Sequence, residues 1–119
     1  MTNTRRFGLL QGIIVLAAAA TALIHIGLAF QFPGGVDPVF VLNGLGYLVL
    51  TALLFLPFPA LARYHNLVRW VLLAYTLVTV VAWYLIGVRS TIAYVDKAIE
   101  VLLIICLALD WLLARKRAA

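Results

Sequence analysis

The chain has very little charge. Charged residues make up 11% of its 119 residues, and only four of them are acidic. Soluble domains carry charge at about a quarter of their positions. A domain of this size leaves much of its surface in contact with solvent, so its interior cannot hold a composition that is 66% hydrophobic. We therefore exclude a water-soluble globule and expect lipid to surround the chain.

Cysteine and catalytic motifs are also scarce. Cys106 is the single cysteine, so an internal disulfide is excluded. We find no nucleophile–base set, phosphate-binding loop or pair of catalytic carboxylates, and we expect the protein not to be an enzyme. The net charge is +5, but the basic residues lie beside apolar runs, which is typical of membrane orientation and excludes nucleic acid as a partner.

Four long apolar runs dominate the sequence. Each has about 18–25 residues, the length that an α-helix needs to cross the hydrocarbon of a bilayer. A backbone in lipid must satisfy its own hydrogen bonds, so we expect each run to be helical. Proline and glycine clusters at 33–38 and 57–59, and Gly87, separate the runs. The expected helices cover residues 8–32, 39–56, 67–87 and 94–113, with a polar loop at 60–66.

Short connections make neighbouring helices antiparallel. The sequence therefore predicts one domain over residues 1–119, an all-α integral membrane four-helix bundle with up-down-up-down topology. The start of the chain also resembles a signal peptide. Its apolar run continues beyond the length of a signal sequence, which favours an uncleaved span.

The distribution of Lys and Arg predicts an orientation. Seven of the nine lie near the N-terminus, the second loop or the C-terminus, and two lie near the other helix ends. Cytoplasmic segments carry the excess of positive charge, so we expect a prokaryotic cytoplasmic membrane with both termini in the cytoplasm. The seven are Arg5, Arg6, Arg63, Arg69, Arg115, Lys116 and Arg117, and the two are Arg89 and Lys97.

Several polar residues share one depth. At 1.5 Å per residue they fall within roughly one helical turn of each other, in the outer half of the membrane. The predicted cluster contains His25, Asn43, Trp83, Tyr84, Asp96 and Glu100. A pair of His25 and Glu100 fits either a proton relay or cation site, or a hydrogen bond that fixes helix register, and the second interpretation is favoured.

The helix faces refine this prediction. On the first helix, Gln11, Ala18, Ala22, His25 and Ala29 form a stripe of mostly small residues that lets a neighbour approach closely. We expect an interior that is polar in its outer half and apolar towards the cytoplasm. Asp96 and Lys97 are expected at a solvated rim. Gly44 and Gly46 indicate either close helix approach or a local unwinding at a ligand.

The two histidines raise the question of a cofactor. His25 and His65 lie at different depths, so one haem iron cannot be held by both. A metal site needs three or four convergent ligands, and only His25, Asp96 and Glu100 are available, so we expect neither a metal nor another cofactor. Arg63, His65 and Arg69 form a basic patch at the inner surface, which either binds anionic lipid head groups or only orients the loop.

Four short segments together carry a resemblance to other proteins. They are His-Ile-Gly-Leu at 25–28, Leu-Asn-Gly-Leu-Gly-Tyr at 42–47, Trp-Tyr at 83–84 and Asp-Lys-Ala-Ile-Glu at 96–100. With these segments the chain resembles a group of small prokaryotic four-helix membrane proteins without an assigned activity. The resemblance implies a four-span fold and nothing about a reaction or substrate.

The sequence leaves three functions open. The first is an accessory or structural subunit, surrounded by membrane lipids, that associates with itself or with a larger membrane complex. The second is a small proton- or cation-coupled transporter or channel that uses Glu100 and His25. The third is a binder of haem, quinone or another lipophilic cofactor.

Overall fold

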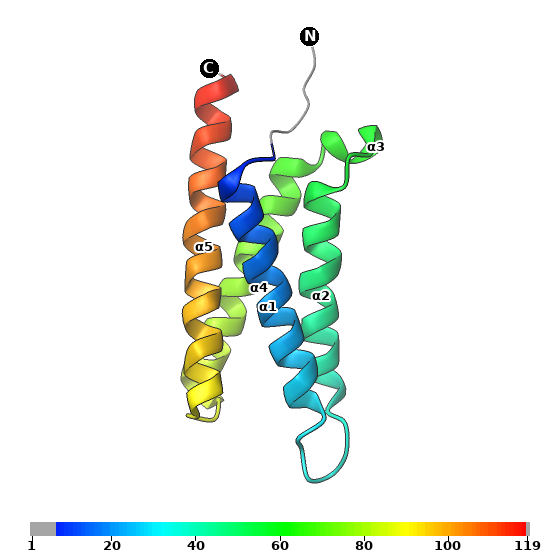
Figure 1. Cartoon of the computed structure of the whole chain (residues 1–119), viewed down its shortest axis with the longest axis vertical. Coiled ribbons are helices and arrows are strands. Elements are labelled where there is room, and N and C mark those ends of the chain that lie inside the picture. Colours follow the sequence, from blue (N-terminus) through cyan, green and yellow to red (C-terminus); the bar gives the residue numbers. More distant parts are fainter. Residues whose placement is uncertain (1–6, 119) are drawn as a thin grey trace.

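The computed structural model describes residues 7–118, which form an all-helical chain without a strand in that range (Figure 1). Arg5 and Arg6, which contributed to the predicted orientation, lie outside these residues. The five helices are α1 (Leu9–Ala29), α2 (Pro38–Phe55), α3 (Pro59–Ala62), α4 (His65–Ile86) and α5 (Thr91–Ala118).

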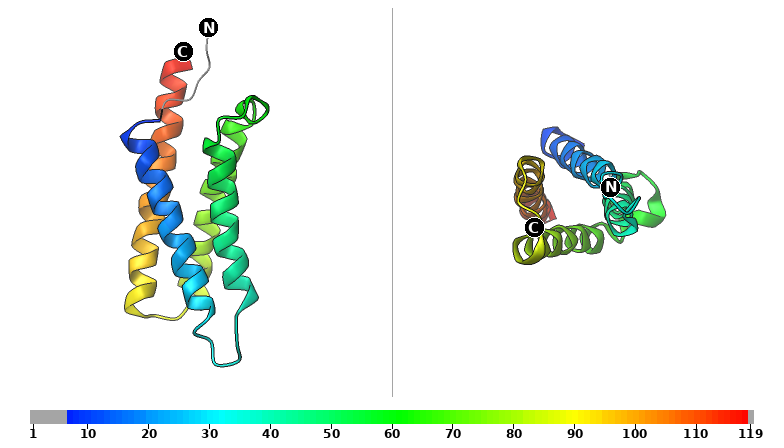
Figure 2. Two further views of the ribbon diagram at one scale, coloured as in Figure 1. Left: turned by 45° about the vertical axis from the view of Figure 1, so that its right-hand side comes forward. Right: turned by 90° about the horizontal axis from the view of Figure 1, so that it is seen from below.

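The four long helices lie side by side, and each runs opposite to the long helix before it (Figure 1). Helix α1 packs against α2 and α5, and α4 packs against α5 and α2 (Figure 2). We call the end where α1 begins and α5 finishes the terminal end. The opposite end, with the connections 30–37 and 87–90, is the loop end.

Local sequence signals explain where the helices begin and end. The Asp37 carboxylate accepts a hydrogen bond from the Val39 amide at 2.9 Å, and Pro38 occupies the first position of α2, where its missing N–H costs nothing. Gly35 in the preceding connection has φ of 112°, a conformation that side chains disfavour. Helix α2 stops at Phe55, just before the prolines at 57 and 59.

The helix boundaries differ from the predicted ones by one to five residues, and α1 ends at Ala29 instead of residue 32. The expected loop at 60–66 contains the short helix α3 and the start of α4, because Pro59 favours the first position of a helix. Helix α5 begins at Thr91, where the Ser90 hydroxyl accepts a hydrogen bond from the Ala93 amide at 3.2 Å. It continues to Ala118 because basic residues are favourable in a last helical turn.

Helices α1, α2 and α4 are long and apolar enough to cross a membrane. Helix α5 is longer still but contains Asp96, Lys97, Glu100 and Asp110. Aliphatic side chains cover the outside of the bundle, with Leu16 and Leu23 exposed by 72% and 66%. The arrangement is therefore apolar outside, while charged side chains of α5 point inward.

Small residues bring α1 and α2 together. All five residues of the stripe predicted on α1 are buried, which confirms the close packing of that face. A methyl group on Gly44 would lie 2.6 Å from the Ile26 side chain and 2.7 Å from the Ala22 carbonyl oxygen. Helix α2 continues unbroken through Gly44 and Gly46, so these glycines serve close approach and not unwinding.

Candidate functional site

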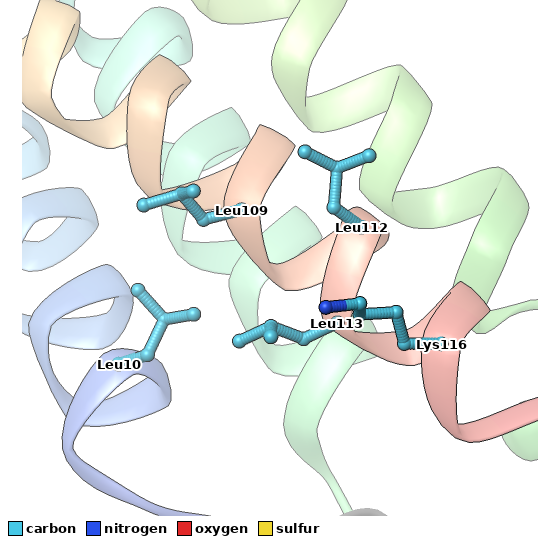
Figure 3. Close-up of a pocket in the computed structure, with 5 residues that line it drawn as sticks. All are labelled: Leu10, Leu109, Leu112, Leu113 and Lys116. Atoms are coloured by element: carbon cyan, nitrogen blue, oxygen red, sulfur yellow. The ribbon is translucent and has the colours of Figure 1, made fainter.

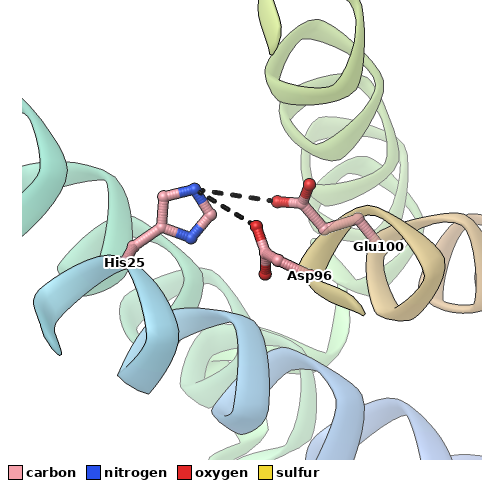
Figure 4. Close-up of side chains that lie close together, drawn as sticks. All are labelled: His25, Asp96 and Glu100. Atoms are coloured by element: carbon pink, nitrogen blue, oxygen red, sulfur yellow. Dashed lines mark ion pairs between the residues drawn. The ribbon is translucent and has the colours of Figure 1, made fainter. Parts of the chain in front are cut away.

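Three ionisable side chains converge near the loop end of the bundle (Figure 4). The Nε2 atom of His25 on α1 lies 3.7 Å from Oδ2 of Asp96 and 4.0 Å from Oε2 of Glu100, both on α5. All three residues are buried, and Glu100 is fully inaccessible. Burial of two carboxylates is costly unless charges and hydrogen bonds compensate them, so this cluster is the first candidate for a functional site.

Helical spacing builds the cluster from two faces. Thr21 and His25 are four residues apart on α1, and Asp96 and Glu100 are four apart on α5, so each pair shares one side of its helix. The small side chain of Ala22, fully buried beside them, allows the helices to approach. The sequence prediction that His25 and Glu100 share one depth agrees with this geometry.

Two hydroxyl groups hold the carboxylates. The Tyr47 hydroxyl of α2 donates to Oε2 of Glu100 at 2.6 Å. The Thr21 hydroxyl lies 2.6 Å from Oδ1 of Asp96 and 3.1 Å from Oε2 of Glu100. Its single proton can serve one carboxylate at a time, and the shorter distance favours Asp96. Helices α1, α2 and α5 are therefore joined through one buried network.

The backbone fixes the tautomer of His25. Its Nδ1 atom lies 2.8 Å from the carbonyl oxygen of Thr21. A carbonyl oxygen can only accept a hydrogen bond, so Nδ1 carries a proton and donates it. Nε2 is then the ring atom that faces Asp96 and Glu100, either as a lone pair or, in the imidazolium, as a second donor.

The prediction that Asp96 and Lys97 lie at a solvated rim was wrong. Asp96 and Lys97 are both buried, and the Lys97 ammonium contacts Oε1 of Glu100 and lies 3.2 Å from Oδ2 of Asp96. Lys97 comes directly after Asp96 in α5, and its long side chain reaches back to both carboxylates. It therefore neutralises part of the charge that the acids bring into the interior.

An apolar cleft of about 1440 Å³ reaches the cluster from the loop end. Its walls come mainly from α2 and α4, which pack together less extensively than the other neighbouring pairs. Four ionisable residues line it: Asp37, which precedes α2, and His25, Asp96 and Lys97, which together we call the floor. Its walls include Phe40, Asn43, Tyr75, Thr79, Ala82 and Trp83.

The structure places the remaining predicted cluster residues around this cleft or outside it. Asn43 and Trp83 line the walls, and the Asn43 carbonyl accepts a hydrogen bond from the Tyr75 hydroxyl at 2.7 Å. Tyr84 is 69% exposed and lies on the outside of α4, so its assignment to the cluster was wrong. Depth is shared by Trp83 and Tyr84, but adjacent residues of a helix point about 100° apart.

A second ionic network lies towards the terminal end. The Arg69 Nε donates to Oδ2 of Asp110 at 2.8 Å, and the Gln11 Nε2 donates to Oδ1 of Asp110 at 2.8 Å. Arg69 and Asp110 are both buried. Two predictions were therefore wrong: this half of the interior is not purely apolar, and Arg69 does not join a surface patch. Arg63, by contrast, is exposed over the Tyr64 ring.

A continuous apolar layer separates the two networks. It is formed by side chains of all four long helices that are fully buried in the bundle. Its principal members are Ile14, Ala18, Leu54, Leu72, Leu103 and Leu107. The cleft therefore gives the His25 cluster access from the loop end. Between the cluster and the terminal end, packed apolar side chains fill the interior of the described residues.

A smaller hollow of about 390 Å³ lies between α1 and α5 at the terminal end (Figure 3). Leu10 and three leucines of α5 line it, together with the side chain of Lys116. Only this one polar group borders it, so the hollow lacks the convergent charges of the cleft and is the weaker candidate for a site.

Thr21 and Tyr47 belong to the site but were not predicted. Threonine and tyrosine are common in membrane helices, and their residue types alone do not mark them. Thr21 could have been found because it precedes His25 by four residues. Tyr47 could have been found because it follows Asn43 and Gly44 on the face of α2 that the glycine presents to α1.

Comparisons of the chain with protein families, with curated proteins and with solved structures found no match.

Proposed function

We propose that the chain is an integral membrane four-helix bundle with up-down-up-down topology, in a prokaryotic cytoplasmic membrane with both termini in the cytoplasm. Its apolar exterior and buried ionic networks support this proposal, because lipid reverses the usual surface polarity of a protein. At the terminal end Arg63, Arg115, Lys116 and Arg117 are exposed, and Arg89 is the exposed basic residue near the loop end. This asymmetry favours a cytoplasmic terminal end.

Aromatic pairs at both ends support the same placement. The rings of Trp70 and Trp111 lie 5.3 Å apart towards the terminal end, and those of Trp83 and Tyr94 lie 5.2 Å apart towards the loop end. The Arg89 guanidinium lies 4.1 Å above the Trp83 ring. Tryptophan and tyrosine with a nearby cation are typical of the two interfaces of a bilayer.

Within this frame, the protein binds a small amphiphilic molecule in the cleft between α2 and α4. The observation that carries the proposal is the charged floor of His25, Asp96 and Lys97 beneath apolar walls. Ligand sites are mostly apolar with a few convergent polar groups that orient the ligand. An apolar body fits the walls, and a hydrogen-bonding head group fits the floor.

The same geometry favours this proposal over transport. A transporter or channel needs a polar route from the cluster to the other side of the membrane. The buried apolar layer, including Ile14, Leu72 and Leu107, closes that direction in the described structure. The accessory or structural role expected from the sequence stays a prediction, which the experiment below also addresses.

The test is native mass spectrometry of the protein extracted from its own membrane in a mild detergent. We expect one tightly held amphiphile per chain. Ala82→Phe should remove it, because the larger side chain fills the cleft wall. Ala98→Phe is the matched control, since Ala98 is an exposed alanine on α5 that does not line the cleft.

Two results would contradict the proposal. One is wild-type protein without a bound molecule, and the other is the same bound mass in the Ala82→Phe and Ala98→Phe variants. Emergence of the protein with a larger complex, unchanged by either substitution, would instead support the accessory role.

A further inference from the structure

The buried charges of the bundle do not balance. Among residues 7–117 the buried charged side chains are Arg69, Asp96, Lys97, Glu100 and Asp110, which is two cations against three carboxylates. Arg69 and Asp110 compensate each other at the terminal end. The remaining carboxylates, Asp96 and Glu100, lie at the cleft floor with Lys97 as the single buried lysine, so one negative charge is left there for the imidazole of His25 or a bound cation to balance.

The position of this excess charge is specific. With Nδ1 donating to the Thr21 carbonyl, the Nε2 lone pair of neutral His25 points towards Oδ2 of Asp96 and Oε2 of Glu100. Three electron-rich atoms that face one another in a buried site repel unless a positive group lies between them. The Lys97 ammonium offsets part of this repulsion, since it lies 3.2 Å from Oδ2 of Asp96 and contacts Oε1 of Glu100, but a single lysine faces two carboxylates.

We infer that His25, Asp96 and Glu100 form a binding site for a divalent first-row metal ion. One ligand atom from each lies within 4.8 Å of the others. Ligands about 2.1 Å from a tetrahedral zinc ion are about 3.4 Å apart, so the two distances from His25, 3.7 and 4.0 Å, need to close by about 0.3 and 0.6 Å. The two carboxylate atoms, which lie within 4.8 Å of each other, need to close by at most about 1.4 Å. The sequence identified the same three residues as possible ligands but led us to expect no metal, because it does not show that they converge.

The surroundings match those of known metal sites. A histidine ligand usually donates its other ring nitrogen to a carbonyl or carboxylate, as His25 does to Thr21. Ligating carboxylates are usually hydrogen-bonded in turn, as Glu100 is by Tyr47 and Asp96 by Thr21. Three protein ligands leave at least one coordination position, which is typical of sites that accept water or a substrate group.

A metal ion can reach the site through the cleft. His25 lies four residues before the end of α1, and Asp96 lies five residues after the start of α5, so the site is about 6–8 Å below the helix ends. Both residues line the cleft that opens at the loop end. The inference does not depend on an amphiphile in that cleft, and the test uses the metal alone.

The experiment measures metal binding to purified, tag-free protein in detergent after treatment with a chelator. Titration with Zn²⁺ in a calorimeter and with Co²⁺ in an absorption spectrometer should give one ion per chain. Stoichiometric binding should be lost in His25→Gln and in Asp96→Asn. Asp37→Asn and His65→Gln are the matched controls, because they change the same residue types outside the cluster and should bind as the wild type does.

Lys97→Met should raise the affinity for the metal, whereas the ligand substitutions should lower it. The ammonium of Lys97 repels a divalent ion held by Asp96 and Glu100, so its removal should raise the affinity for Zn²⁺ by about tenfold or more. A merely structural network would not bind metal more tightly after the loss of one of its members. Methionine keeps most of the length of the lysine side chain, which limits the change in packing.

X-ray absorption of the zinc-loaded wild type keeps the test independent of whether variants fold. We expect a first shell of nitrogen and oxygen with a single imidazole. Absence of stoichiometric binding, binding retained in a folded His25→Gln variant, or a shell with sulfur or several imidazoles would overturn the inference. If no metal binds stoichiometrically, a proton on His25 would balance the charge instead.

Discussion

Arg69→Met should destabilise the bundle by about 3–5 kcal/mol, because it removes the guanidinium that pairs with the buried Asp110 carboxylate. Asp110 is fully buried, and Arg69 donates to one of its oxygens at 2.8 Å. Gln11 donates to the other oxygen at 2.8 Å and remains in the variant, but a neutral amide does not compensate a charge. Methionine replaces most of the aliphatic part of the side chain, so the loss comes from electrostatics.

The reverse substitution should cost less. Asp110→Asn keeps an acceptor for Gln11 or Arg69, and Arg69 lies only four residues from the start of α4, where a long side chain can extend to water. We expect about 1–3 kcal/mol for this loss of one charged hydrogen-bond partner. The double variant Arg69→Met with Asp110→Leu should lie within about 1–2 kcal/mol of wild type, because a buried ion pair and an apolar pair of similar volume are often near equal.

The assay is reversible unfolding in mixed micelles, with the fraction of sodium dodecyl sulfate as denaturant and circular dichroism as the signal. A double-mutant cycle needs the same replacement at 110 in the single and double variants, so Arg69→Met, Asp110→Leu and their combination are compared to isolate the coupling between Arg69 and Asp110. We expect a coupling of several kcal/mol. Additive effects, or a cost of Arg69→Met below about 1 kcal/mol, would refute the view that the charge of Arg69 stabilises the buried Asp110 carboxylate.

Three further substitutions test the packing, the hydrogen bonds and the orientation of the bundle. Gly44→Ala should destabilise by about 1–3 kcal/mol in the micelle assay, because its methyl group has no room, whereas Gly12→Ala, with open space around the new methyl group, should stabilise by about 0.5–1 kcal/mol. Tyr47→Phe should cost about 1–3 kcal/mol by removing the hydrogen bond to Glu100, and an unchanged unfolding midpoint would contradict that bond. Arg117→Cys, with the native cysteine replaced by serine, should react with an impermeant maleimide only in inside-out vesicles, and labelling of intact cells would reverse the proposed orientation.

The sequence predicted what depends on depth and on single-helix faces. Rise per residue placed His25 and Glu100 at one level, and the spacing of Asp96 and Glu100 placed both acids on one side of their helix. The small-residue stripe of α1 was predicted for the same reason. These features depend on helix geometry alone, so they required no knowledge of how the helices rotate against each other.

What the sequence could not predict depends on rotation between helices. Tyr84 shares its depth with the cluster but faces outward, while Tyr47, four residues beyond Asn43, reaches Glu100. Lys97 was expected at a wet rim because charged residues near helix ends usually reach water. Its burial depends on carboxylates that happen to face the same interior, which only the packed bundle determines.

Helix α5 explains why both ionic networks exist in one small protein. Its acids at 96, 100 and 110 lie on one stripe, and 14 residues of helix separate the first from the last by about 21 Å. One face of α5 therefore brings negative charge to both halves of the interior. At Asp110, α4 contributes Arg69 and α1 contributes Gln11, and each donates a hydrogen bond to one carboxylate oxygen. The partners of Asp96 and Glu100 are one lysine from α5 itself, two hydroxyl groups and an imidazole. The first set is closed and fits a structural role, whereas the second retains a negative charge and opens to a cleft, as a binding site requires.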